Sequence, residues 1–138
     1  MKPYDIVEHT ADIGIRAYGE TLGELFVNAA RGLFDIIADL EGLKVSTSIK
    51  IKLEAANAEE LLVAWLDELI YNFYTKNIIF SEFKINDLSE TEISAEAFGR
   101  HIGNKKSRLK TEVKAATYHG LKIEEKNKRY EVQIIFDV

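Results

Sequence analysis

Hydrophobic residues recur at helical spacing in two segments of the chain, and each segment begins with a residue that can cap a helix. In the first segment Thr21 and Glu24 have the spacing of a capping box, and we expect this helix to end near Gly42. In the second, Asn57 precedes acidic residues that suit the start of a helix. Both helices are predicted to be amphipathic, each burying one face. Their apolar stripes are Leu22, Leu25, Phe26, Ala29, Leu33 and Ile37, and then Leu61, Leu62, Trp65, Leu66, Leu69, Ile70 and Phe73.

Most of the remaining chain alternates between apolar and polar residues, which is the period of a half-buried β-strand. The alternation is strictest from Val45 to Glu54. We expect one turn near Asn86-Asp87 and another over Lys126–Lys128. Because short turns join antiparallel strands, the sequence predicts an α+β fold with two amphipathic helices packed on antiparallel β-sheet. The predicted strands are residues 4–8, 13–18, 45–54, 78–85, 91–98, 113–118, 121–125 and 130–136.

Length and composition limit the class of protein. A chain of 138 residues without a linker-like segment fits a single domain, residues 1–138. Cysteine is absent, which excludes disulfides and thiolate metal sites. No apolar run approaches the roughly 20 residues that span a bilayer, so we expect no membrane contact and a cytoplasmic location. The net charge of −5 argues against a general nucleic-acid-binding protein and leaves room for an acidic cluster that binds a cation.

Acidic groups lie at two points of the chain that a sheet could bring together. Asp12 lies between two predicted strands, and Asp137 and Val138 follow the last one, with Val138 carrying the α-carboxylate. If the last strand pairs beside the first strands, these carboxylates converge and repel one another unless a cation lies among them. Oxygen ligands of this kind suit Ca²⁺ or Mg²⁺ rather than zinc. The alternative is that Asp12 forms a turn and that Asp137 is a solvated residue at the end of its strand.

Histidines and a basic segment are the other candidates for polar chemistry. His9 lies beside Asp12, and His119 lies between two predicted strands. Either histidine could serve as an acid–base group or remain a hydrogen-bonding loop residue. The segment Arg100–Lys110 holds five Lys and Arg residues and could contact RNA phosphates or an acidic protein face. It could equally be a solvated loop, because it contains no aromatic residue on which bases could stack.

Several of these segments together resemble the archease family, in the expected order and over nearly the whole chain. The sequences HTAD, VKAATYH and FDV are the most specific parts of the match. One departure is Arg100, since many members carry an acidic residue after the glycine that corresponds to Gly99. The matching segments are His9–Ile15, Glu20–Phe26, Ala29–Asp35, Leu61–Phe73, Glu112–His119 and Val132–Val138.

The resemblance implies a function as well as a fold. Archeases are partner proteins of the tRNA-splicing RNA ligase, which uses GTP and Mn²⁺ to join RNA ends. They promote guanylylation of the ligase and its multiple turnover. The resemblance therefore implies an accessory protein that is not an enzyme, whose contact with RNA is indirect. It also implies a bound divalent metal, Ca²⁺ first and Mg²⁺ or Mn²⁺ as alternatives, at Asp12, Asp137 and Val138.

Polar contacts near this site are expected from His9, Lys114 and His119. Two other functions stay open on the residues alone. One is a stand-alone metal-dependent hydrolase or phosphotransferase that uses a histidine as its base. The other is a tRNA-binding chaperone that acts through Arg100–Lys110.

Overall fold

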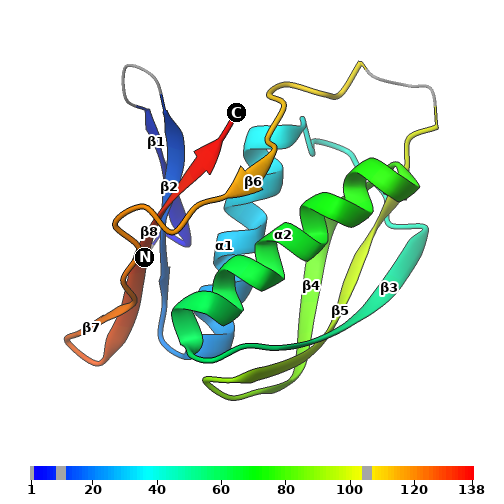
Figure 1. Ribbon diagram of the computed structural model, residues 1–138. Helices are drawn as coiled ribbons and strands as arrows, with labels where there is room; N and C mark the ends of the chain where they lie inside the picture. Colours follow the sequence, from blue (N-terminus) through cyan, green and yellow to red (C-terminus); the bar gives the residue numbers. More distant parts are fainter. Residues whose placement is uncertain (1, 9–11, 104–106) are drawn as a thin grey trace.

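The first predicted helix is present in the structure, a computed structural model of the chain (Figure 1). Helix α1 spans Leu22–Ile37, and the Thr21 hydroxyl accepts a hydrogen bond from the Glu24 N–H at 3.1 Å. The predicted end near Gly42 was wrong. The chain is already extended at Ala38, which forms a β-bridge with the segment after β5 instead of continuing the helix. The structure describes residues 2–8, 12–103 and 107–138.

The second predicted helix also begins after its capping residue. Helix α2 spans Ala58–Lys76, and the Asn57 side chain accepts a hydrogen bond from the Glu60 N–H at 2.9 Å. It ends at Asn77, whose left-handed conformation (φ 55°) is typical of a helix C-terminus. No helix within the described residues has both the length and the apolar character that crossing a bilayer requires.

The strands form two sheets, and every strand pair in the described part of the chain is antiparallel. The order is β1-β2-β8-β6 in the larger sheet, where β7 also pairs with β8, and β3-β5-β4 in the smaller one. The predicted strands 113–118 and 121–125 are reduced to β6 and β7. The α+β fold of helices on antiparallel β-sheet is confirmed, with the sheet divided in two. The strands are β1 Tyr4–Glu8, β2 Ile13–Gly19, β3 Thr47–Glu54, β4 Ile78–Leu88, β5 Glu92–His101, β6 Ala115–Ala116, β7 Glu124–Lys126 and β8 Arg129–Asp137.

The turn between β4 and β5 lies later than predicted. Strand β4 continues through Asn86, and its register with β5 shifts between Ile85 and Asp87. The turn follows at Ser89, whose hydroxyl accepts a hydrogen bond from the Glu92 N–H at 3.1 Å. The predicted turn at Asn86-Asp87 was wrong because the strand accommodates these residues as a bulge.

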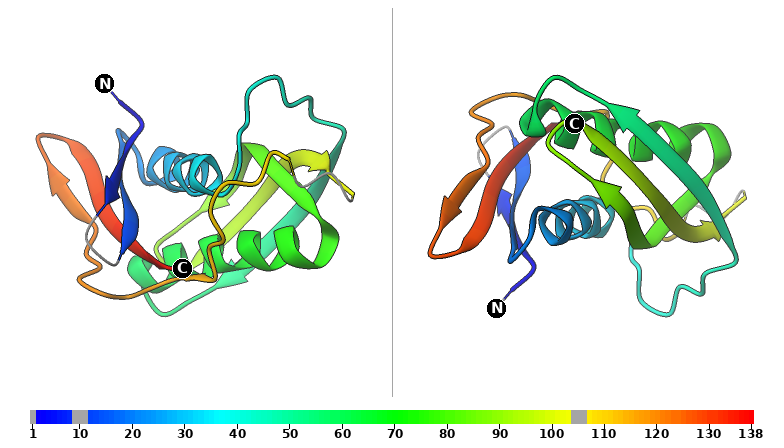
Figure 2. Two further views of the ribbon diagram at one scale, coloured as in Figure 1. Left: turned by 90° about the horizontal axis from the view of Figure 1, so that it is seen from above. Right: turned by 90° about the horizontal axis from the view of Figure 1, so that it is seen from below.

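Helix α1 packs on β2 of the larger sheet and on β4 of the smaller one, and α2 packs on α1, β3, β4 and β6 (Figures 1 and 2). The ring of Phe34 on α1 meets those of Phe73 and Phe80 edge-on, with centroids 6.3 and 5.5 Å away. Trp65 on α2 is fully buried, and its indole N–H donates to the Phe26 carbonyl at 3.0 Å. This shared core joins the two sheets and positions the strand ends of the larger one.

Candidate functional site

The acidic residues predicted to converge lie at neighbouring strand ends of the larger sheet. In the β2–β8 pair Ile13 lies opposite Phe136. Asp12 precedes Ile13 and Asp137 follows Phe136, so one further step of the same register sets Asp12 opposite Asp137. Both carboxylates belong to exposed residues, and both line a hollow of about 280 Å³ together with Val138. We call this the acidic hollow.

The alternation of β8 explains which residues face the acidic hollow. Phe136 and Ile134 are buried in the core. Their neighbours along the strand must point to the opposite face, because successive side chains of a strand alternate. Ile135 and Asp137 therefore share the outer face of the sheet, and both line the hollow.

Strand β6 borders the acidic hollow from the other side of β8. Ala115 lies opposite Asp137, and the Lys114 N–H donates to the Asp137 carbonyl at 2.7 Å. The hydroxyl and the N–H of Thr117 both donate to the Ile135 carbonyl, at 2.8 and 3.0 Å. These contacts hold the chain after β6 against the end of β8.

The residues predicted to make polar contacts are placed differently from one another. His119 lines the acidic hollow with Asp12 and Asp137. Lys114 reaches Asp137 through its main-chain N–H, and its side chain is not part of the lining. His9 lies outside the described residues. The structure therefore brings one of the three, His119, to the lining of the hollow.

A partly buried carboxylate that the sequence pattern did not single out supports β6. Asp67 on α2 accepts a hydrogen bond at 2.8 Å from the Ala116 N–H. Burial raises the pKa of Asp67 above its ordinary value of 3.8, and the hydrogen bond from Ala116 opposes this shift. The signal in the sequence was an acidic residue one helical turn from both Val63 and Ile70, on the apolar side of the helix.

We expect Asp67→Asn to raise the free energy of unfolding at neutral pH. A carboxyl group whose pKa is raised by folding favours the folded state while protonated, and this contribution is lost as the pH rises above the ordinary value of 3.8. Asparagine keeps an oxygen for the Ala116 N–H and carries no charge. Urea denaturation should show the gain near neutral pH and its disappearance below pH 3.8. Glu90→Gln, in an exposed turn, is the control, and a less stable Asp67→Asn at neutral pH would contradict the prediction.

The donor atoms of the acidic hollow suit a hard divalent cation. Asp12 and Asp137 offer carboxylate oxygens and Val138 offers main-chain oxygens, which Ca²⁺ and Mg²⁺ prefer as ligands. Within the part of the chain that the structure describes, no three His, Asp or Glu side chains are grouped so as to hold a metal ion. A cation at this position would therefore depend on main-chain oxygens and water besides the two carboxylates. The residues present fit calcium or magnesium better than zinc.

A larger hollow continues from the acidic hollow along the outer face of the larger sheet. It measures about 590 Å³, and Asp12, His119 and Ile135 line both hollows. Two of the cations that line it are engaged within the protein. Arg16 donates to a β8 side chain at 2.7 Å, and Lys126 forms ion pairs of 3.3 and 2.9 Å with glutamates of β7 and β8. This extended polar surface suits contact with another macromolecule.

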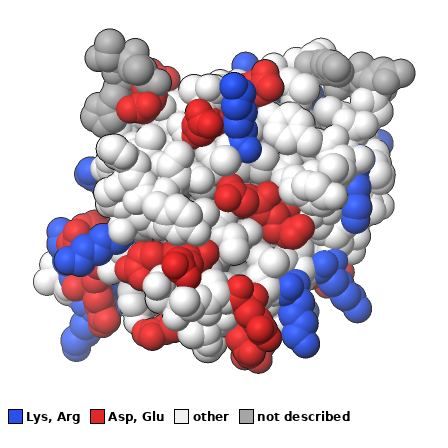
Figure 3. All heavy atoms as spheres, viewed as in Figure 1, with Lys and Arg blue, Asp and Glu red and all other residues white. Residues whose placement is uncertain are grey.

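The predicted basic segment lies apart from the acidic hollow. Arg100, His101 and Arg108 line a different hollow together with Lys44, and residues 104–106 lie outside the described chain. On the face covered by α2, carboxylates gather over the middle and most Lys and Arg side chains lie toward the edges (Figure 3). The basic segment therefore lies apart from both the acidic hollow and the carboxylates in the middle of this face.

Comparison with known proteins shows relatives over the whole chain. The model of the Archease protein family matches residues 4–138. The chain is 37% identical over 141 residues to the protein archease of Methanosarcina barkeri. This match covers 99% of this chain and 97% of that protein. It is 36% identical to the protein archease of Pyrococcus furiosus, over 100% of both chains.

Solved structures agree with the sequence relatives. The solution structure of protein 1598 from Methanobacterium thermoautotrophicum is 30% identical, covers 100% of both chains and superposes with a TM-score of 0.86. An archease of Thermotoga maritima, described as a possible chaperone, has the same fold at 22% identity, with a TM-score of 0.62 over 100% of this chain and 97% of that one. None of these names states a catalysed reaction. The resemblance in the sequence is thereby confirmed, and the chain belongs to the archease protein family.

Proposed function

We propose that this protein activates the GTP-dependent tRNA-splicing RNA ligase as an accessory protein, by promoting guanylylation of the ligase and its multiple turnover. Family membership supports this function, since it is the activity that the family resemblance implies. The observation that carries the proposal is the acidic hollow, which Asp12, Asp137 and Val138 line at the end of the β2–β8 pair.

An exposed strand end suits insertion into the active site of a partner protein. Strand β8 ends at Asp137, and Val138 beyond it is 45% exposed. In Figure 1 the chain end marked C lies at one end of the molecule, near β1, β2 and β6. The main-chain contacts of β6 and β2 on either side hold this end in place, which lowers the cost of ordering the main chain when the carboxylates approach a partner.

In this proposal Asp12, Asp137 and Val138 also hold a divalent cation, Ca²⁺ first and Mg²⁺ or Mn²⁺ as alternatives. The two carboxylates would bind it directly, and Val138 would contribute main-chain oxygens. The cation, when bound, would offset the repulsion between the carboxylates and attract phosphate oxygens. His119 lies where it can contact a group bound in the hollow.

The ligase, rather than RNA, is the proposed direct partner. The carboxylates gathered over the α2 face repel the phosphates of RNA (Figure 3). Contact with RNA is therefore indirect in this proposal. The cytoplasmic location expected from the sequence stays a prediction.

The test is Asp12→Ala in a ligation assay with the purified ligase, RNA ends, GTP and Mn²⁺. We expect stimulation by this variant to fall by at least about tenfold, because one of the two carboxylates of the hollow is lost. The readouts are the guanylylated ligase and the number of ligated products per ligase. Asp87→Ala removes an exposed carboxylate from β4 and should stimulate as the native protein does. Undiminished stimulation of the ligase by Asp12→Ala would contradict the proposal.

A second readout separates the metal from the ligase contact. Calorimetric titration of the isolated protein with CaCl₂ should show binding that Asp12→Ala and Asp137→Ala each abolish and that Asp87→Ala retains. No binding by the native protein, or equal binding by all four proteins, would rule out the proposed cation site.

The two alternative functions give different results in the same experiments. A stand-alone hydrolase or phosphotransferase would turn over RNA or nucleotides with metal and no ligase. A tRNA-binding chaperone would bind tRNA with an affinity that falls steeply as salt rises. Neither result is expected.

A further inference from the structure

A separate hollow lies between the loop that follows α1 and the end of β5, on the opposite side of the molecule from β7 (Figure 2). Its volume is about 270 Å³, and its polar lining comprises Lys44, Arg100, His101, Ser107 and Arg108. No acidic residue of the described chain lines it, although the protein as a whole has a net charge of −5. We call this the basic hollow.

Neutral oxygen atoms hold both guanidinium groups of the basic hollow. Arg108 donates from Nη1 to the main-chain carbonyls of Asp39 and Glu41, at 3.1 and 2.7 Å. Arg100 donates from Nη1 to the main-chain carbonyl of Lys44 at 3.3 Å. Contacts of this kind fix the position of a guanidinium and leave its full positive charge uncompensated.

Within the described residues, neither arginine forms an ion pair. The Asp39 carboxylate accepts the Glu41 N–H at 3.0 Å inside its own turn. The nearby pair of Lys110 and Asp35, at 3.8 Å, lies outside the lining. Because a guanidinium has several N–H donors, Arg100 and Arg108 both keep donors for a ligand.

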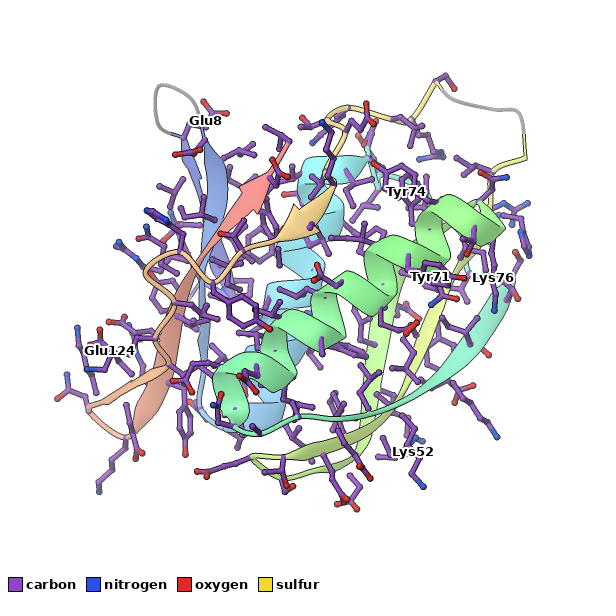
Figure 4. The ribbon with its side chains drawn as sticks, in the orientation of Figure 1. Glu8, Lys52, Tyr71, Tyr74, Lys76 and Glu124 are labelled. Carbon is purple, nitrogen blue, oxygen red and sulfur yellow. The ribbon has the colours of Figure 1, made fainter. Side chains whose placement is uncertain are left out.

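The remaining lining contains a histidine fixed by a main-chain contact and a turn with open main chain. His101 Nδ1 lies 3.0 Å from the Lys76 carbonyl at the end of α2 (Figure 4). A carbonyl only accepts, so Nδ1 carries the hydrogen and donates it to this carbonyl. Gly42, which lines the hollow, has a φ of 71°, and a Cβ there would meet no heavy atom within 4 Å. A ligand can therefore approach the main chain closely at this turn.

We propose that the basic hollow is a binding site for a phosphate group. Planar guanidinium groups bind phosphate oxygens in pairs, and two of them with an ammonium match a doubly charged anion better than a single carboxylate. The basic hollow shares no lining residue with the acidic hollow. The inference therefore stands or falls independently of ligase activation.

The test is a titration of the full chain with inorganic phosphate at constant ionic strength, followed by amide chemical shifts in NMR spectra. We expect saturable shifts centred on Gly42, Lys44 and Ser107. The double variant Arg100→Gln, Arg108→Gln should bind phosphate at least about tenfold more weakly, because two charge-assisted donors are lost. Shifts spread evenly over the surface lysines would overturn the proposal.

Two further variants separate binding from folding and from net charge. Lys44→Gln removes a side chain that forms no ion pair with the described residues, and it should also weaken phosphate binding. Lys52→Gln with Lys84→Gln removes the same charge as the double arginine variant from exposed positions of the smaller sheet, where Figure 4 labels Lys52. This control should bind as the native protein does. Unchanged phosphate affinity in Lys44→Gln, or equal weakening in the lysine control, would contradict a specific phosphate site in the basic hollow.

Competing probes identify the source of the phosphate. Uridine monophosphate and a short single-stranded oligoribonucleotide are the competing probes, and at least one of them should displace inorganic phosphate and shift the same amides. Tighter binding of the oligoribonucleotide would assign the site to a nucleic-acid backbone, and tighter binding of the mononucleotide would assign it to a free nucleotide. A polyglutamate peptide that binds as tightly as either would overturn the phosphate assignment in favour of an acidic protein surface.

Discussion

Replacing Trp65 by alanine should lower the free energy of unfolding by about 3–5 kcal/mol, the range for a buried tryptophan. Trp65 is the largest fully buried side chain among the described residues. Its ring meets that of Phe83 on β4 edge-on at 6.0 Å, and its N–H donates to the Phe26 carbonyl of α1 at 3.0 Å. Alanine removes the contacts that Trp65 makes with the smaller sheet and with α1 together. Urea denaturation followed by circular dichroism is the measurement, since the chain has no other tryptophan for fluorescence.

The variant Trp65→Phe separates packing from hydrogen bonding. Phenylalanine keeps most of the ring contact and loses the N–H that reaches Phe26. We expect it to cost about 1–2 kcal/mol, the scale of one hydrogen bond and a small cavity. Equal losses in the two variants would assign the effect to the hydrogen bond. A loss below about 1 kcal/mol in Trp65→Ala would contradict the role of this contact in joining the layers.

Replacing Gly99 by alanine should cost about 3 kcal/mol, the upper end of the usual cost of overpacking. Gly99 lies in the middle strand of the smaller sheet, beside the register shift of β4 between Phe80 and Glu82. A Cβ at this position would overlap the Ile79 carbonyl and lie 2.8 Å from the Ile78 side chain. The neighbour is main chain within a paired strand, so it cannot move aside without breaking the pairing. Thermal unfolding measures the loss.

Gly23→Ala is the matched control for Gly99→Ala. A Cβ at Gly23 would meet its nearest atoms, on Leu88 and Thr21, at 3.9 Å, which is ordinary contact. Gly23 lies in the first turn of α1, where alanine is the better helix former by up to about 1 kcal/mol. The control should therefore leave the stability unchanged or raise it. A loss in both variants would show that the smaller sheet has no special need for Gly99.

The helices were predictable because their signals are local. The cap residues Thr21 and Asn57 each bind an N–H three residues ahead, so a few neighbouring residues decide where each helix begins. The end of α1 was less predictable, because this helix stops where Ala38 pairs with Leu109, which lies far along the chain. The prediction of a turn near Asn86 was wrong for a related reason, because pairing of β4 with β5 accommodates these residues as a bulge.

The candidate site was predictable in its chemistry and not in its assembly. Alternation along β8 places Asp137 on the outer face once Phe136 is buried. Asp67 was missed, because a carboxylate on a helix gives no sign of the strand that will donate to it. The basic hollow combines Lys44 with Arg100 and its neighbours, which no spacing in the sequence connects.

The α+β class, the starts of both helices, the alternating faces of the strands and the family could all be predicted from the sequence. These follow from short-range periodicity, capping and local motifs, which each residue carries wherever the chain folds. The division of the sheet in two and the pairing of β8 with β2 depend instead on contacts between distant segments. Arg16 and Gln133 are 117 residues apart in the sequence and yet donate and accept one hydrogen bond across that pair. The helices pack against both sheets, and this packing selects the pairing of β8 with β2. The pairing brings Asp12 and Asp137 to one hollow.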